Sequence, residues 1–190
     1  MKRELVVRRG AHICIALAPV YYLLPEQLPV IGVGRWVLLV VFIVGIAAFE
    51  AHRLRKGITF LGLRPHEKGQ IASFVWAAAG ITVVLWLVPH DIATAALIGM
   101  AFVDPLAGEL RHADRSSGIT FGLSFVVYFS IAASALALME YRTLLGSVVM
   151  GGVGSIVAVA SESYKTRHVD DDFLMAVAPA GVMWAASVAF

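Results

Sequence analysis

Long apolar runs, interrupted by short charged segments, are the feature that most restricts what this chain can fold into. Several runs approach the roughly 20 residues that a helix needs to cross a bilayer, and they lack the alternating polar period of a membrane barrel. Of the 190 residues, 59% are hydrophobic and 15% are charged, and the mean hydropathy is +0.83. These values exceed those of a soluble domain of this size. The sequence therefore predicts an all-α, polytopic membrane helix bundle that forms one integral membrane domain, 1–190.

Seven apolar segments are expected to cross the membrane, with proline, glycine and charged residues between them. They cover approximately residues 11–24, 31–49, 71–88, 92–108, 119–139, 143–161 and 173–190. We interpret the first as a retained anchor, because Glu4 and His12 do not suit a signal peptide and no small-residue cleavage site follows them. Cys14 is the only cysteine, which excludes an intramolecular disulfide.

The basic residues predict the orientation of the bundle. With a cytoplasmic N-terminus, the cytoplasmic segments would be 1–10, 50–70, 109–118 and 162–172. Of the 15 Lys and Arg residues, only Arg35 and Arg142 fall outside these segments. The positive-inside rule therefore favours seven crossings with the N-terminus in the cytoplasm. Most carboxylates lie in the same segments, so we expect a cell-membrane protein whose working face is cytoplasmic.

Asp104 lies at the cytoplasmic end of an apolar segment, in "IGMAFVDPLAGELR". An aspartate near hydrocarbon costs roughly 2.5 to 3.5 kcal/mol on insertion scales unless it has a partner. One interpretation is a structural ion pair with an arginine of the neighbouring loop. The other, which we favour, is a ligand for a divalent cation or a base at the membrane surface.

A second acidic site is predicted in "SESYKTRHVDDDF", where three adjacent aspartates meet the start of the last apolar segment. Three like charges repel one another unless a cation compensates them, and carboxylate oxygens suit Mg²⁺ that carries a nucleotide or a diphosphate. A solvated acidic face is the alternative. We expect metal binding here, with Glu162 contributing beside the aspartates.

The segment 50–70 combines five basic residues with three glycines, a composition that suits polyphosphate. The same basic residues satisfy the topology and attract anionic lipid headgroups, so their number alone does not decide between the two interpretations. Glu67 beside Lys68, and Glu50 at the edge of the preceding helix, favour a binding site.

His12 follows Arg9 by three residues in "RRGAHI", so one helical turn sets a cation and a titratable imidazole on the same face. A lone histidine would be explained as a core residue, whereas His12 with Arg8 and Arg9 indicates a phosphate or a reacting hydroxyl at the interface. The sequence contains no P-loop, dinucleotide fingerprint, HExxH or nucleophile elbow. It also lacks the aromatic platform of a nucleic-acid binder.

In this order, the motifs resemble those of the membrane kinases that use CTP to phosphorylate a lipid alcohol: dolichol kinase, phytol and farnesol kinases, and the CTP-dependent diacylglycerol kinase. "RRGAH" is similar to the family's Arg-Lys-x-x-His, at Arg8, Arg9 and His12. "FEAHRL", followed by "RPHEKGQ", stands where the family has an acidic, arginine-bearing helix end and then a glutamate-containing loop.

"VDPLAGELR" is similar to the family's Asp-x-x-Ala and arginine-bearing turn, at Asp104, Ala107 and Arg111. The most specific match is "SESYKTRHVDDDF", with a glutamate, seven intervening residues and then Asp-Asp-Asn, where Asp172 replaces the asparagine. The family's lysine-serine-glycine stretch after the Asp104 turn is absent. In its place stands "RHADRSSGITFG", where Arg115 is the only evident substitute for the lysine.

The resemblance implies Mg²⁺-dependent phosphoryl transfer from CTP to a polyprenol or another isoprenoid or lipid alcohol. The implied catalytic residues are Asp104, His12 and Arg9; the nucleotide-binding residues are Arg8, Arg64, Glu67, Lys68, Arg111 and Arg115; and the metal ligands are Asp104, Glu162, Asp170 and Asp171. The expected partners are the lipid alcohol, the nucleotide and the bilayer, without nucleic acid and with a homodimer left open. A cytidylyltransferase that makes a CDP-activated lipid is the enzymatic alternative. A small membrane transporter or lipid-binding protein is the alternative of a different class.

Overall fold

The computed structural model describes residues 2–29, 32–139, 143–164 and 169–189, with the side chains of residues 2–5 excepted. The helices are α1 (Lys2–Cys14), η1 (Ile15–Leu23), α2 (Trp36–Lys56), η2 (Pro65–Gly69), α3 (Ser73–Leu87), α4 (His90–His112), α5 (Ser117–Leu138), α6 (Leu144–Ser163) and α7 (Asp171–Ser187), where η denotes a 3-10 helix. Two short strands, β1 (Gln27–Leu28) and β2 (Val33–Gly34), pair antiparallel. Apart from this small hairpin, the predicted all-helical fold is confirmed.

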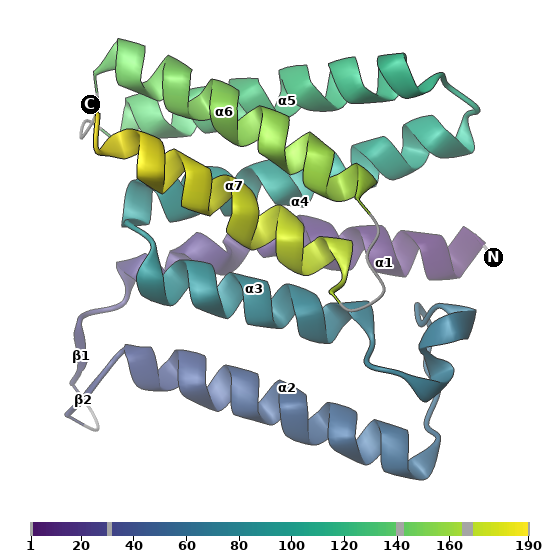
Figure 1. Ribbon diagram of the computed structural model, residues 1–190. Coiled ribbons are helices and arrows are strands. Elements are labelled where there is room, and N and C mark those ends of the chain that lie inside the picture. Colours follow the sequence, from purple (N-terminus) through teal and green to yellow (C-terminus); the bar gives the residue numbers. More distant parts are fainter. Residues whose placement is uncertain (1, 30–31, 140–142, 165–168, 190) are drawn as a thin grey trace.

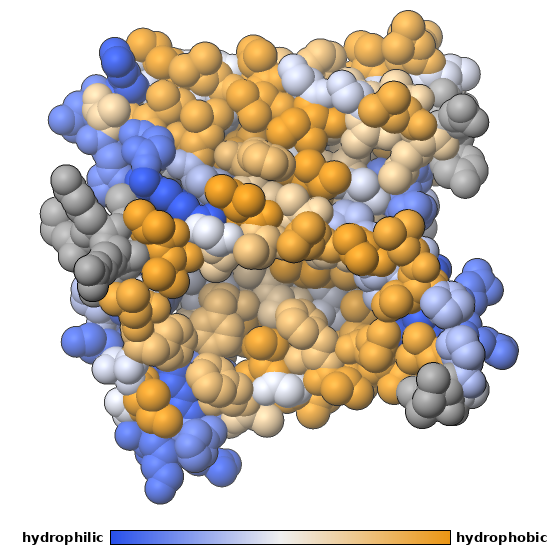
Figure 2. Space-filling view, turned by 180° about the vertical axis from the view of Figure 1, so that it is seen from behind, coloured by the Kyte–Doolittle hydropathy of each residue, from blue (hydrophilic) through white to orange (hydrophobic). Residues whose placement is uncertain are grey.

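Four of the helices, α2, α4, α5 and α6, are long and apolar enough to cross a membrane. Helix α3 is apolar but has 15 residues, which is shorter than a typical crossing. Figure 2 shows a broad apolar band on one face of the molecule, with hydrophilic residues gathered toward its two ends. These features indicate a membrane protein. The predicted number of seven crossings stays a prediction.

Two of the predicted segments have different boundaries in the structure. The first, expected as one helix over 11–24, divides where α1 ends at Cys14 and the chain continues as the 3-10 helix η1, with Pro19 inside it. Proline lacks the amide hydrogen of a regular α-helical turn, which favours such a change. The second, expected at 31–49, begins after the β1–β2 hairpin and continues to Lys56. There Gly57 caps it in the left-handed conformation, at φ 64°, a region that favours glycine.

Helix α4 lies at the centre of the bundle, in contact with α1, η1, α5 and α7 (Figure 1). Its apolar face forms a continuous core with methionines of α7, including Met175 and Met183. Helix α7 also packs closely on its neighbours. A Cβ atom at Gly80 of α3 would lie 2.9 Å from the Ala176 Cβ of α7, and one at Gly154 of α6 would lie 2.8 Å from Met183.

The motifs identified in the sequence gather at one end of this bundle. Figure 1 shows the N-terminus, the α2–α3 connection, the α4–α5 connection and the start of α7 at that end, while the hairpin and the C-terminus lie at the other. Antiparallel packing of successive helices brings these distant segments together. The fold therefore places the charged segments around one common region.

Candidate functional site

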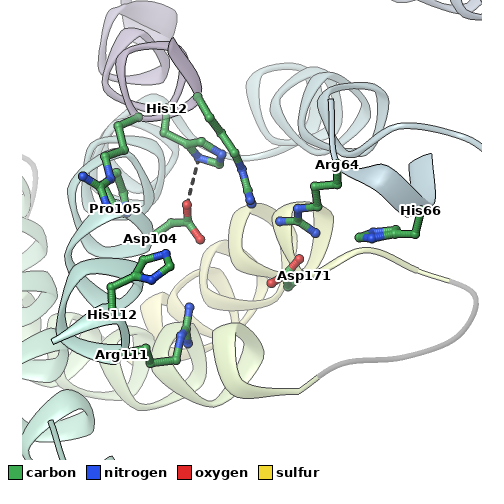
Figure 3. Close-up of a pocket in the computed structure, with 11 residues that line it drawn as sticks. His12, Arg64, His66, Asp104, Pro105, Arg111, His112 and Asp171 are labelled. Carbon is green, nitrogen blue, oxygen red and sulfur yellow. Dashed lines mark ion pairs between the residues drawn. The ribbon is translucent and has the colours of Figure 1, made fainter. Parts of the chain in front are cut away.

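A polar pocket of about 350 Å³ opens at this end of the bundle (Figure 3). Its lining comes from α1 (Arg8, Arg9 and His12), from the α2–α3 connection (Arg64 and His66), from α4 (Asp104, Pro105, Gly108, Arg111 and His112) and from α7 (Asp171). Four parts of the chain that are far apart in sequence thus contribute charged side chains to one cavity. The arrangement places arginine and histidine side chains around carboxylates, which suits an anion that arrives with a cation.

His12 lies between two aspartates at the base of this pocket. It is only 7% exposed, its Nδ1 is 3.3 Å from Asp104 Oδ2, and its Nε2 is 3.8 Å from Asp172 Oδ1 (Figure 3 shows the first contact). Among the described residues, neither His12 Nδ1 nor Asp172 Oδ1 has a hydrogen-bond partner. The imidazole therefore lies between a carboxylate from α4 and another from α7 without a hydrogen bond to either.

The other carboxylates around the pocket also have basic neighbours. Arg111 pairs with the buried Glu162, and Arg9 pairs with the exposed Glu109. Asp170 Oδ2 lies 3.8 Å from Arg64 Nη1. Burial, followed by the neighbouring Asp171 carboxylate, raises the pKa of Asp170 to about 6.

Two sets of described side chains have donor atoms that all lie within 4.8 Å of one another: His12, Asp104 and Asp172; and Asp170, Asp171 and Asp172. The second set consists only of carboxylates, which are the ligands that Mg²⁺ prefers. Asp172 belongs to both sets, and it is 1% exposed with no hydrogen-bond partner for its Oδ1 among the described residues. The residues present are therefore compatible with a hard divalent cation.

A buried ion pair ties the α2–α3 connection to the end of α2. Arg53 is completely buried, and it donates two hydrogen bonds to Glu50, from Nε at 2.6 Å and from Nη2 at 2.7 Å. Arg53 Nη2 also donates to the backbone carbonyl oxygens of Glu67, at 3.1 Å, and Gln70, at 2.8 Å. The Ala72 amide donates to Glu50 Oε1 at 2.8 Å. These hydrogen bonds fix the last part of the α2–α3 connection, from Glu67 to Ala72, against the end of α2.

Glu67 then fixes the part of the connection that carries Arg64. Its carboxylate accepts a hydrogen bond from the Arg64 amide at 2.8 Å and another from the Ser73 amide at 3.1 Å. Glu67 is buried, whereas the Arg64 side chain reaches the pocket. The geometry therefore gives Glu67 a structural contact, although the sequence resemblance assigned it to the nucleotide.

The structure brings together most of the side chains singled out in the sequence. Arg8, Arg9, His12, Arg64, Asp104, Arg111 and Asp171 line the pocket, and Glu162 and Asp170 adjoin it through their ion pairs with Arg111 and Arg64. Lys68 and Arg115 are exposed and are not part of the lining. Lys165 and Arg167, which contributed to the predicted orientation, lie outside the described residues.

Sequence reasoning included Asp172 in the acidic cluster without choosing it as a metal ligand, and it assigned no role to His66 and His112 in the pocket wall. A signal for Asp172 was present, because it begins a helical repeat of buried residues that continues with Met175, Ala176, Pro179 and Met183. That spacing turns Asp172 inward, toward α4 and α1. No comparable pattern pointed to the two histidines.

A second, apolar cavity of about 290 Å³ adjoins the polar pocket. It runs between α1, α2 and α3, and its lining includes Phe42, Ile46, Phe74 and Ile81. Arg8 and His12 line both cavities. The two cavities therefore lie next to each other, on either side of these two side chains.

Comparison with known proteins gives no further assignment, because no protein-family model, curated protein or solved structure matches this chain. The functional interpretation consequently depends on the motifs and on the geometry of the two cavities.

Proposed function

We propose that this protein transfers the terminal phosphoryl group of a nucleoside triphosphate, with CTP as the expected donor, to the hydroxyl of a polyprenol or another lipid alcohol. In the proposed topology the chain crosses the membrane seven times, with the N-terminus and the polar pocket on the cytoplasmic side. The nucleotide would then enter from the cytoplasm, and the alcohol from the bilayer.

The convergence of four sequence-distant motifs on one pocket is the observation that supports this proposal. His12 of α1 faces Asp104 of α4 and Asp172 of α7, and Arg64 reaches the same pocket from the α2–α3 connection. A polyphosphate needs several cationic donors, and a phosphoryl transferase needs little beyond positioning and charge neutralisation. The pocket offers both within reach of an apolar cavity.

Roles for the chain's residues follow from their positions. Arg8, Arg9 and Arg64 would bind the phosphates, and Arg111 would join them by exchanging its contact with Glu162. Asp170 and Asp171, whose donor oxygens lie within 4.8 Å of each other, would hold Mg²⁺. Asp104 and Glu162 would add negative charge nearby, since Glu162 lies close enough to Asp104 and Asp171 to interact with their charges. Mg²⁺ at such a site neutralises charge on the transferred group and on the leaving diphosphate.

In the transfer step, the alcohol oxygen forms a bond to the γ-phosphorus while the bond from that phosphorus to the β–γ bridging oxygen breaks. The hydroxyl proton passes to Asp104 Oδ2, the oxygen that faces His12. The products are the lipid phosphate, CDP and a proton. Because the pocket opens beside apolar space, the lipid can remain among the helices while its hydroxyl meets the phosphates.

The test is a transfer assay with purified protein in detergent, using CTP labelled in the γ position, Mg²⁺, and a panel of polyprenol, geranylgeraniol, phytol and diacylglycerol. We expect label in one lipid and CDP as the second product. Asp104→Asn should lower the rate about 100-fold or more, because it removes negative charge near the metal and the group that accepts the proton.

Asp114→Asn is the matched control, since Asp114 is an exposed aspartate at the same end of the bundle that does not line the pocket. It should leave the rate within about twofold of the wild type. Release of diphosphate in place of CDP, from a lipid phosphate substrate, would indicate a cytidylyltransferase. Failure of CTP, ATP, UTP and GTP to label any of the alcohols would contradict the proposal.

A further inference from the structure

The apolar cavity beside the polar pocket has a defined shape. Its walls come from α1 and the start of η1, with Ala11 and Ile15, and from α2, with Phe42 and Ile46. Its floor is α3, where the small residues Ala77 and Ala78 leave room for a ligand (both line the cavity and are largely buried). The cavity is therefore a groove between two helices, with a third helix beneath it. We call it the α1–α3 groove.

Aromatic packing fixes one side of the α1–α3 groove. The Phe60 and Phe74 rings, which line it, have centroids 6.0 Å apart, and both contact Phe49 at 6.2 and 6.1 Å. The packed rings present apolar faces to a ligand, which suits a hydrocarbon chain.

The head of the groove is polar, because Asp172 and His12 belong to its lining. Asp172 is 1% exposed, and its Oδ1 has no hydrogen-bond partner among the described residues. A buried carboxylate oxygen without a donor costs free energy, so this position favours a ligand that supplies one. The unpaired carboxyl oxygen can accept a hydrogen bond, and an alcohol is the simplest lipid group that donates one.

We propose that the α1–α3 groove binds the tail of a single-chain lipid alcohol and that, before the nucleotide binds, Asp172 accepts the hydrogen bond of its hydroxyl, which turns to Asp104 in the transfer step. This inference rests on the proposed function, because it identifies the acceptor site of the same reaction. It gives Asp172 a substrate-binding role, separate from the metal-binding role of Asp170 and Asp171.

The charges and the volume of the α1–α3 groove favour an alcohol with a single hydrocarbon tail as the ligand. The groove lining contains two acidic residues, Glu67 and Asp172, against Arg8 as its one arginine or lysine among the described residues, so a neutral alcohol is favoured over a lipid phosphate. The groove's volume of about 290 Å³ lies at the lower edge of the roughly 300 to 1,000 Å³ usual for ligand pockets. One chain fits such a volume, whereas the two acyl chains of a diacylglycerol need more apolar space.

The test measures binding directly, without nucleotide or divalent cation. Purified full-length protein in detergent is photolabelled with a farnesol analogue that carries a diazirine on its tail, and the modified residues are mapped by mass spectrometry. We expect labels on the lining residues of α1, α2 and α3. Farnesol and geranylgeraniol should compete with the probe, whereas farnesyl phosphate and dioleoylglycerol should compete at least tenfold more weakly.

Two pairs of variants make the assignment specific. Ala78→Phe should fill the groove and reduce labelling at least tenfold, while Ala79→Phe, on the same helix but outside the lining, should reduce it less than twofold. Asp172→Leu should weaken alcohol binding about tenfold, whereas Asp172→Asn, which keeps an oxygen acceptor, should weaken it less. Ala78→Val, a smaller filling, replaces Ala78→Phe if that variant does not fold.

Labels outside the groove, or equal competition by farnesyl phosphate or dioleoylglycerol, would overturn the inference. So would an Asp172→Leu variant that loses Mn²⁺ affinity while its alcohol affinity is unchanged, because Asp172 would then be a metal ligand only. If the alcohol binds as expected and no nucleotide supports transfer, the proposed function fails and the groove assignment stands. If transfer occurs but Ala78→Phe leaves the KM for the alcohol unchanged, the groove assignment fails and the proposed function stands.

Discussion

His12 lies where three helices meet. Its ring lies within 3.8 Å of carboxylates from α4 and α7 while its backbone belongs to α1. Among the described residues, His12 Nδ1 and Asp172 Oδ1 have no hydrogen-bond partner, so both atoms retain unused hydrogen-bonding capacity. Such groups at the junction of a polar and an apolar cavity can bind a ligand without first breaking hydrogen bonds between side chains.

Asp170 makes cation binding dependent on pH, because burial and Asp171 raise its pKa to about 6. Below that pH a proton competes with the cation for the carboxylate. We expect the affinity for Mn²⁺, measured by electron paramagnetic resonance titration, to fall about tenfold per pH unit below pH 6 and to level off above pH 7. Asp170→Asn should remove this slope, and a wild-type affinity that is flat between pH 5 and pH 7 would contradict the assignment.

The effect of pH on the free energy of unfolding, measured without metal, has the opposite sign. The folded-state pKa of Asp170 lies above its ordinary value of 3.8, so between pH 4 and pH 6 the folded protein binds more protons than the unfolded chain. The contribution of Asp170 to the free energy of unfolding therefore increases as the pH falls from about 6 to about 4.

Arg53 is a second residue whose replacement should have a predictable effect on the free energy of unfolding. Arg53→Met would leave the Glu50 carboxylate buried without its cation, so we expect the free energy of unfolding to fall by about 3 to 5 kcal/mol. The double variant Glu50→Gln, Arg53→Met should lose less, because no charge is left unpaired. Arg55→Met, an exposed arginine of the same helix end, is the control and should change stability by less than about 0.5 kcal/mol.

The measurement for this set is equilibrium unfolding of the detergent-solubilised protein. Equal losses for the single and double variants would mean that the ion pair does not stabilise the α2–α3 connection. In that case Arg64 would be held in the pocket by other contacts, such as the Glu67 carboxylate.

At the scale of elements, the position of α7 decides where the aspartates lie. Asp170 is its N-cap and accepts a hydrogen bond from the Asp172 amide at 3.1 Å, while the positive end of the helix dipole faces the three carboxylates. Close packing on α3 and α6 then holds the helix in place. The acidic cluster depends on how closely these helices approach one another.

Gly80→Ala tests this dependence. The new Cβ atom would lie 2.9 Å from the Ala176 Cβ and 3.3 Å from the Phe173 backbone, so α3 and α7 must separate. We expect a loss of about 1 to 3 kcal/mol in the free energy of unfolding and a lower Mn²⁺ affinity, because the start of α7 moves. Both quantities are measured on the protein in detergent.

Gly45→Ala is the matched control on α2, since a Cβ atom there meets no atom within 4 Å. Its stability should be unchanged or higher by up to about 1 kcal/mol, because alanine favours a helix more than glycine does. If both glycine variants behave alike, the close approach of α3 and α7 is not what positions the aspartates.

At the scale of the whole molecule, the two ends of the bundle differ in chemistry. One end carries the polar pocket, whereas the other carries the hairpin and a cluster in which Arg35 lies over the Tyr21 and Tyr22 rings and donates to the backbone carbonyl oxygens of Tyr22 and Leu24. The described ends of the chain lie at opposite ends of the bundle (Figure 1). This arrangement is compatible with an odd number of crossings.

Cysteine accessibility tests the proposed topology. In a Cys14→Ser background, a membrane-impermeant maleimide added to intact cells should label Gln27→Cys in the hairpin region and should not label Ser117→Cys at the start of α5. Permeabilised cells should give labelling at both positions, because both residues are exposed in the fold. The reverse pattern would place the N-terminus outside, and labelling of both positions in intact cells would contradict a spanning bundle.

Much of the architecture could be predicted from local composition. Each of the seven apolar segments corresponds to helical structure, because hydropathy and helix-breaking residues act within a short stretch of chain. The division between α1 and η1 and the late start of α2 were not predicted. Both depend on how that part of the chain packs, through contacts of η1 with α4 and the pairing of β1 with β2.

From the sequence, the types of residue in the site could be predicted, but not the contacts between them. The sequence alone determined an all-helical chain with its charges between apolar segments, and it identified acidic and basic motifs such as those at His12 and Asp104. Only the tertiary structure decided that Asp172 faces His12, that Glu67 holds a loop, and that an apolar groove adjoins the pocket. These contacts depend on the rotation and the neighbours of each helix, which result from packing across the whole bundle and which no local pattern of residues specifies.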